Sequence, residues 1–460
     1  MKRRSFIKKT TALSLLPLVK PLGNFSTQSE NMKIKIDQIA SDFERQPLVR
    51  PFGFKGGYLT ELWQAVSLMK TAAGTPKISL ATQSVLYGDP AVFSAHSESA
   101  GNALMYALSE RALQLTKTTP FNTPVDLLEN ILPEVKRYAV ALTGSDDVNL
   151  NFIYNALVSV DNAAWLVYAS ENRLENFDAM IPALYKKPLS THNTKVAVMY
   201  QIPYGMPIDD ILKAAAAGYF VFKIKTGMPG SQEQMLQADI ERLTRVHNAL
   251  KDLRTLHTKD GKLVYTLDAN QRYQKKETVL KYLDHARKIG AFDQIKLFEE
   301  PFPESNNDDV RDLGIVIGAD ESVHTEADAL KRIAQGYRTL VLKGIAKTLS
   351  LSMKIAKVAQ DNNVACICAD LTVNPLLLDW HKNLVARLHP FPGVGMPMIE
   401  TNGDMNYKNW STMKTWHPVQ NASWQQVRQG VFELNDDFYK RSGGIFMDIP
   451  HYENMFTRHH

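Results

Sequence analysis

Apolar and polar positions repeat between residues 195 and about 402 in the order strand, turn, helix. Short apolar runs predict eight strands, at Val196–Ile202, Tyr219–Lys225, Leu263–Asp268, Gln294–Glu299, Ile315–Asp320, Thr339–Lys343, Val364–Cys368 and Met396–Glu400. Apolar residues at helical spacing predict helices between most of them, at Ile208–Ala217, Gln232–Leu250, Lys276–Ile289, Ala327–Gln335, Ser350–Gln360 and Pro375–Leu388. This alternation is typical of a (β/α)8 barrel within an α/β protein.

The chain before this repeat follows a different pattern. The predicted elements are strands at Met32–Ile39, Glu61–Met69 (equally readable as a helix) and Lys77–Leu86, then helices from Gly101 onward and at Val125–Leu142 and Tyr154–Ser170. Strands followed by helices indicate a separate α+β domain, which we place at residues 32–190. The glycine-rich stretch Arg50–Tyr58 is either a flexible flap or an ordinary loop.

The chain has 460 residues, of which 44% are hydrophobic, enough for about two domains. We expect the barrel to span residues 191–404. Residues 405–460, rich in Trp, Tyr and Asn, do not continue the repeat, and we expect them to pack on residues 32–190 as part of a capping domain.

The positive charge of the chain is concentrated at its start. Without the six Lys and Arg side chains of residues 1–22, the formal charge falls from +5 to −1, so no basic surface for nucleic acid is expected. Arg3 and Arg4 precede a short apolar run at Thr11–Val19, which resembles a twin-arginine export signal within residues 1–31. The run is too short for a membrane anchor. A signal of this kind without an anchor predicts export to the periplasm.

The remaining composition excludes a disulfide-rich protein. Cys366 and Cys368 are the only cysteines, two residues apart on one predicted strand. Without further ligands nearby they make a poor zinc site, so we expect buried, inert thiols.

Chemistry is indicated where the predicted barrel strands end. Successive strands finish with polar residues on the inward-facing row, namely Lys223 and Lys225, Asp268 and Asn270, Glu299, Asp320, and Lys343. Three inward carboxylates repel one another unless a cation neutralises them, and oxygen ligands suit Mg²⁺. A bound Mg²⁺ can stabilise the enolate that forms when a proton leaves the carbon next to a carboxylate. Lys223 beside Lys225 is expected to lower the pKa of that lysine toward the range of a useful base.

These residues resemble the enolase superfamily, in particular its branch similar to muconate lactonizing enzyme, strongly over residues 195–400 and in outline over the cap. The resemblance implies that Asp268, Glu299 and Asp320 are the metal ligands. It also implies that Lys225 and Lys343 are the acid and base on opposite faces of the substrate, with Lys223 tuning the pair. A lysine at position 343, and no histidine after the seventh strand, favours this branch over that of mandelate racemase.

The chain departs from the family pattern at three places. Gly344-Ile345 stands where a Gly-Gly pair is common, which leaves Lys347 as an alternative to Lys343. The 43 residues between Lys225 and Asp268 imply an extra loop near Thr255–Lys262. On the eighth strand Glu400-Thr401-Asn402 replaces the Asp-x-Asp with which dipeptide epimerases hold a substrate amine.

We therefore predict an enzyme that removes the proton α to a carboxylate of a small molecule, most simply a racemase or epimerase of an amino-acid derivative or dipeptide. Sugar-acid dehydration or cycloisomerisation shares the same enolate and stays open. A non-catalytic exported binding protein is the alternative of another class. Substrate contacts are expected from Asn270, Arg50, Lys55 and Glu400, and relatives of this kind are often homo-oligomers.

Overall fold

The computed structural model describes residues 33–54, 57–369 and 372–457 and divides the chain into two compact units, Met1–Met32 and Lys33–His460. The predicted export signal with Arg3 and Arg4, and the candidate contact Lys55, lie outside the described residues. None of the helices in the described part of the second unit is long and apolar enough to cross a membrane.

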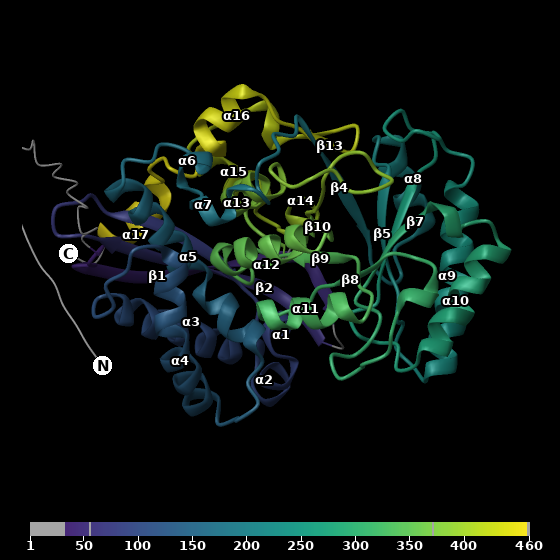
Figure 1. Ribbon diagram of the computed structural model, residues 1–460, viewed down its shortest axis with the longest axis horizontal. Coiled ribbons are helices and arrows are strands. Elements are labelled where there is room, and N and C mark those ends of the chain that lie inside the picture. Colours follow the sequence, from purple (N-terminus) through teal and green to yellow (C-terminus); the bar gives the residue numbers. More distant parts are fainter. Residues whose placement is uncertain (1–32, 55–56, 370–371, 458–460) are drawn as a thin grey trace, which may run out of the picture. The chain divides into compact units, whose positions relative to one another are not determined.

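A closed barrel of eight parallel strands forms the larger part of this unit (Figure 1). Its strands are β4 (Lys195–Ile202), β5 (Val221–Lys225), β6 (Val264–Asp268), β7 (Ile295–Glu299), β8 (Ile317–Ala319), β9 (Thr339–Leu342), β10 (Ala365–Cys368) and β11 (Met398–Glu400). They pair in chain order, and β11 closes the ring on β4. All eight predicted strands are confirmed, because continuous apolar runs mark strands buried on both faces.

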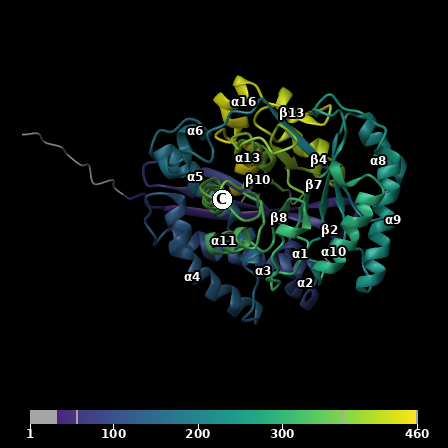
Figure 2. The same ribbon diagram turned by 45° about the vertical axis from the view of Figure 1, so that its right-hand side comes forward.

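Helices follow most of the barrel strands. They are α8 (Ile208–Ala216), α9 (Gln232–Leu250), α10 (Lys276–Lys288), α11 (Glu326–Ala334), α12 (Leu349–Asp361) and α13 (Pro375–Val385), with 3-10 turns η1 (Phe292–Gln294) and η2 (Arg311–Leu313). The neighbours α9 and α10 lie side by side outside the strands (Figure 2). A loop closed by a bridge between Arg254 and Lys262 fills the long interval before β6, as predicted.

The capping region begins with an antiparallel sheet of β1 (Gln38–Phe54), β2 (Gly57–Lys70) and β3 (Lys77–Gln83). Helices follow, namely α1 (Val85–Gly88), α2 (Pro90–Ala95), α3 (Glu98–Thr116), α4 (Pro124–Thr143), α5 (Leu150–Glu171), α6 (Phe177–Met180) and α7 (Ala183–Lys186). The core helix α5 packs on β2 and β3, and one hydrophobic core continues from the cap into the barrel.

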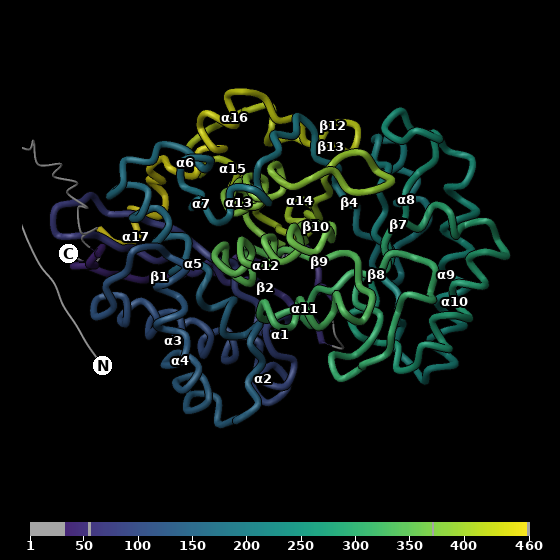
Figure 3. Tube along the Cα trace, in the orientation of Figure 1, coloured from purple at the N-terminus to yellow at the C-terminus, as the bar shows by residue number. Residues whose placement is uncertain are grey.

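Two predictions in the cap are wrong. Among the described residues the first strand starts at Gln38, near the end of the predicted strand Met32–Ile39. Residues 50–54 and 57–58 belong to β1 and β2 at the far end of their hairpin, and not to a flap or a loop. Figure 3 traces the two strands as one long pair. Pro47 and Pro51 obscured the strand in the sequence. Proline is tolerated here because β1 is an edge strand and its register shifts between Pro47 and Phe52.

The C-terminal segment contacts both parts of the unit. Its elements are α14 (Gly403–Asn406), α15 (Trp410–Thr415), η3 (Ser423–Gln425), β12 (Val427–Arg428), β13 (Val431–Glu433), α16 (Asp436–Arg441), η4 (Ser442–Gly444) and α17 (Pro450–Thr457). β13 pairs with β4. Tyr407 bridges to Leu48 of the hairpin, and the Tyr407 hydroxyl accepts a hydrogen bond from Gln64 Nε2 (3.0 Å). The hairpin is therefore fixed at its centre by a segment more than 300 residues away in sequence.

The two cysteines lie on β10 and are buried free thiols. Burial raises the pKa of Cys366 to about 12. Both thiols therefore stay protonated and unreactive near neutral pH, as expected.

Candidate active site

Strand register brings the predicted chemical residues to one end of the barrel. Lys225, Asp268 and Glu299 are direct neighbours across β5, β6 and β7. Asp320 follows β8, and Lys343 follows β9. The carboxyl ends of parallel strands meet at one edge, so period-two alternation within each strand is enough to gather these side chains.

Lys223 lies at the centre of the acidic group. Its Nζ is 3.0 Å from Asp268 Oδ2, 2.9 Å from Glu299 Oε2 and 2.8 Å from Glu400 Oε2, and its side chain is only 1% exposed. Gln201 Nε2 also donates to Glu400 (3.1 Å). Glu400, expected as a substrate contact, therefore has partners within the protein.

The electrostatics of this group are set by the carboxylates around Lys223. Burial alone would lower the pKa of Lys223, but Asp268, Glu299 and Glu400 outweigh it and raise that pKa well above its ordinary value. Burial, opposed by Lys223 and reinforced by the other carboxylates, raises the pKa of Glu299. Lys223 is thus held as a cation by its carboxylate neighbours.

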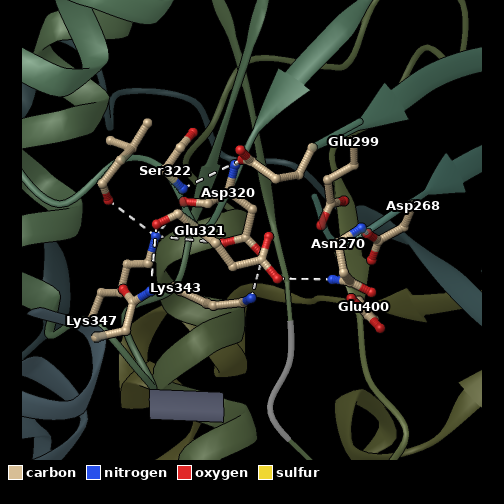
Figure 4. A network of polar contacts seen from close by, with 12 residues as sticks. Asp268, Asn270, Glu299, Asp320, Glu321, Ser322, Lys343, Lys347 and Glu400 are labelled. Atoms are coloured by element: carbon tan, nitrogen blue, oxygen red, sulfur yellow. Dashed lines mark hydrogen bonds and ion pairs between the residues drawn. The ribbon is translucent and has the colours of Figure 1, made fainter. Parts of the chain in front are cut away.

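Lys225 and Asn270 form a second group of contacts, next to Asp268. Lys225 Nζ donates to Asp268 Oδ2 (2.5 Å) and to Asn270 Oδ1 (2.9 Å). Asn270 in turn donates to Glu321 Oε1 (2.8 Å), as Figure 4 shows. Asn270 has a φ of 43°, a left-handed backbone that directs its amide toward both neighbours.

Lys343, rather than Lys347, lines the cavity at this end of the barrel. Lys343 Nζ pairs with Asp320 Oδ2 and lies 4.8 Å from the centre of the Tyr87 ring, within reach of a cation–π contact. Lys347 Nζ instead donates to the backbone carbonyls of Asp320 and Val323 (Figure 4). The pKa of Asp320 is held down to about 2 because Lys343 and Lys347 outweigh the effect of its burial.

Glu300 holds the backbone next to Asp320 in place. It follows Glu299 with a left-handed φ of 39°, is completely buried, and accepts a hydrogen bond from the backbone N–H of Asp320. Burial raises the pKa of Glu300 to about 7. The second glutamate of the Glu-Glu-Pro sequence therefore positions the turn that carries Asp320.

The carboxylates Asp268, Glu299 and Asp320 each contact a lysine ammonium group. Among the residues that the structure describes, no three His, Cys, Asp or Glu side chains are grouped to hold a metal ion. The donor set nevertheless fits a hard divalent cation, because Asp268, Glu299 and Asp320 supply only oxygen atoms from consecutive strands. The ammonium groups of two lysines occupy part of this donor set, with Lys223 Nζ 2.9 Å from Glu299 Oε2 and Lys347 Nζ 3.6 Å from Asp320 Oδ1.

Two connected chambers open above these residues. The inner one has about 570 Å³ of empty space including its opening, and its wall contains every predicted metal ligand and lysine except Glu299, which lies behind Lys223. The outer one has about 1720 Å³ on the same measure. Both are lined by Phe52, Gln201, Lys225 and Asn270, and Arg50 lines the outer chamber.

Several residues of the inner wall carried no prediction from the sequence. They are Leu48, Phe52, Leu59, Leu62, Ser84, Tyr87, Gln201, Glu321, Thr372 and Asn402. The sequence did offer an indication that Glu321 lies at the site, because it directly follows Asp320. The hairpin residues and Tyr87 had none, because they reach the site only through the packing of the cap on the barrel.

Comparison with known proteins reveals similarity of structure and not of sequence. No family model and no curated protein matches the chain. The described fold superposes on a mandelate racemase/muconate lactonizing protein from Herpetosiphon aurantiacus with a TM-score of 0.62 and 17% identity, over 88% of this chain and 97% of that one. The chain shares the fold of this protein.

Two further solved structures support this assignment of the fold. A dipeptide epimerase from Enterococcus faecalis V583, complexed with Mg and L-Leu-L-Tyr, has a TM-score of 0.61 and 16% identity over 88% of this chain and 98% of that one. L-Talarate dehydratase from Polaromonas sp. JS666, complexed with Mg and L-glucarate, has a TM-score of 0.57 and 16% identity over 86% and 91%. The predicted barrel with a capping domain is thereby confirmed, and the predicted resemblance holds at the level of the fold.

Proposed function

We propose that this protein is a Mg²⁺-dependent racemase or epimerase that exchanges the proton α to a carboxylate in an amino-acid derivative or dipeptide. One observation carries the proposal. Lys225 ends the second of the eight strands in the closed barrel and Lys343 directly follows the sixth, so they enter the inner chamber from opposite sides. A base on each side of the α-carbon is what inversion of configuration requires.

Asp268, Glu299 and Asp320 would hold the metal, which is supported by their position at one edge of the barrel and by a donor set that consists only of oxygen atoms. Bound there, Mg²⁺ supplies charge stabilisation to the substrate carboxylate as it becomes an enolate. Binding requires Lys223 Nζ to give up part of its contact with Asp268 and Glu299, and Glu400 remains as its partner.

The lysines provide the proton transfers. One lysine, as the free amine, removes the α-proton from its face, and the other, as the ammonium ion, delivers a proton to the opposite face. Asn270 orients Lys225, and Tyr87 packs beside Lys343. The apolar hairpin residues Leu48 and Leu59 cover the chamber and limit access of water to the reacting carbon.

A lyase is the second candidate. The structurally similar proteins include a sugar-acid dehydratase as well as dipeptide epimerases. Elimination and cycloisomerisation would use the same first proton abstraction, so the pair of lysines is compatible with both.

Exchange of the α-proton in D₂O tests the proposal. We expect NMR of the Mg²⁺-loaded protein to record loss of the α-proton signal, with inversion, for at least one member of a panel of dipeptides and N-acylamino acids. A new keto-acid or lactone signal from a sugar acid would indicate the lyase instead. Protein that binds Mg²⁺ yet exchanges no proton across the panel would contradict an enzyme and favour a binding protein.

Export is a separate proposal, supported by the Arg3-Arg4 pair and the apolar run that follows it. We expect replacement of both arginines by lysine to keep the protein in the cytoplasm, because a twin-arginine route depends on that pair. Fractionation of cells that express the parent and the variant measures this. Equal amounts in the periplasm would contradict the proposal.

A further inference from the structure

The outer chamber differs from the inner one in charge. The described wall of the inner chamber carries Asp268, Asp320, Glu321 and Glu400 beside its lysines. That of the outer chamber carries two arginines and Lys225 and includes no Asp or Glu. Its other walls are mostly apolar or aromatic, with prolines, two methionines and two tyrosines. A chamber with this lining favours an anionic group on an apolar spacer.

The backbone that carries Arg272 into this chamber is held firmly. Gln271, just before it, has a left-handed φ of 69°, and its N–H donates to the carbonyl of Glu300 (2.8 Å). Arg272 N–H donates to the carbonyl of Ala269 (3.1 Å), and its own carbonyl accepts from Gln232 Nε2 (3.0 Å). Such strained but fully bonded turns are typical of functional positions.

The stem of Arg272 is also fixed by close packing. The position that a Cβ on Gly227 would occupy lies 2.6 Å from Arg272 Cβ and 2.7 Å from its Cγ, so only glycine at 227 leaves room for the stem. The guanidinium of Arg272, half-buried at the chamber wall, makes no ion pair or side-chain hydrogen bond with any described residue. The same holds for the exposed Arg50 on the hairpin.

We infer that the outer chamber binds a second carboxylate, at the far end of the substrate, with Arg272 as its main ligand and Arg50 as a second one. A guanidinium presents two parallel N–H donors that match a carboxylate. The apolar walls accept the methylene groups between the two ends. The substrate class is therefore a dicarboxylate, an amino acid whose nitrogen carries an acyl chain that ends in a carboxylate.

This inference deepens the proposed function and rests on it for the position of the reacting end. The geometry assigns that end to the inner chamber, beside Lys225 and Lys343. The shared lining residues Phe52, Gln201 and Asn270 mark the passage between the chambers. One extended molecule can thus occupy both.

Two probes that differ only at the far end test the inference. N-Glutaryl-L-methionine ends in a carboxylate, and N-pentanoyl-L-methionine ends in a methyl group after the same number of methylenes. Their dissociation constants are measured by calorimetry with the full chain and Mg²⁺. We expect the glutaryl probe to bind about tenfold tighter than the pentanoyl probe to the parent, a difference of about 1.4 kcal/mol.

Variants locate the source of that preference. In Arg272→Gln we expect the ratio of the two dissociation constants to fall to about twofold or less, and in Arg50→Gln to fall part of the way. Arg245→Gln, an exposed arginine on α9 that lines neither chamber, is the matched control and should keep the parental ratio. Arg272→Lys, which keeps the charge but not the paired donors, should retain part of the preference and shows that loss in Arg272→Gln is not a failure to fold.

Equal affinities of the two probes for the parent, or a preference that survives Arg272→Gln, would overturn the inference. The proposed function is judged separately by α-proton exchange of the same probes in D₂O. A charge preference that depends on Arg272 without any exchange supports the inference and counts against the enzyme. Exchange of both probes with equal affinity supports the enzyme and overturns the inference.

Discussion

Replacing Lys343 or Lys225 by alanine is expected to lower the rate of α-proton exchange by about 10²- to 10⁴-fold, the range that general acid–base groups contribute. The two losses should differ in stereochemistry. Because the lysines approach from opposite sides of the barrel, each variant should lose abstraction from one enantiomer and retain slow abstraction from the other. NMR exchange in D₂O with each enantiomer of an accepted substrate measures both rates.

Lys347→Met is the control for this experiment. Lys347 is buried like Lys343 but bonds to the carbonyls of Asp320 and Val323 and lines neither chamber. We expect this variant to be less stable, yet once folded to exchange both enantiomers within about tenfold of the parent, since it removes neither acid–base group. If Lys347→Met abolished exchange while Lys343→Ala preserved it, the working residue would be Lys347.

Lys223→Met is expected to destabilise the protein by about 3–5 kcal/mol in EDTA, because removal of one partner leaves buried charges without compensation. Three carboxylates, from Asp268, Glu299 and Glu400, depend on this ammonium ion. Urea unfolding followed by circular dichroism gives the free energy of unfolding. Added Mg²⁺ should recover much of the loss, since a divalent cation can neutralise the same carboxylates.

Lys354→Met provides the matched comparison at the surface. Lys354 pairs with Glu129 and Glu326, and these carboxylates are 56% and 43% exposed. Ion pairs in such surroundings contribute about 1 kcal/mol or less, so we expect a small loss that Mg²⁺ does not recover. A Lys223→Met protein that matched this small loss in EDTA would contradict the central role of Lys223.

The barrel and its strand-end residues were readable from the sequence for a local reason. Buried parallel strands are short apolar runs, and their side chains alternate with a period of two, so a few residues suffice to recognise each strand and its inward row. The carboxyl ends of such strands meet at one edge whatever the loops do. The sequence alone therefore places Asp268, Glu299, Asp320 and Lys343 together.

Other parts of the site have no local signal. The Tyr87 contact with Lys343, the bond of Tyr407 to Gln64 and the pairing of Lys223 with Glu400 each join residues more than 170 positions apart. The raised pKa of Lys223 follows from that last contact together with Asp268 and Glu299, because the three carboxylates outweigh the effect of burial. The hairpin strand was hidden by Pro47 and Pro51, which an edge strand tolerates because no further strand of the sheet needs their missing N–H groups.

The sequence by itself thus determined the order of the barrel elements and the chemical types of side chain at its mouth, because both depend on neighbours within a few residues. Tertiary packing alone decided which cation neutralises which carboxylate, which lysine faces the chamber, and where Arg272 lies. Those outcomes depend on distance and burial between segments that meet only in the folded chain, and Coulomb interactions and desolvation are set by that proximity.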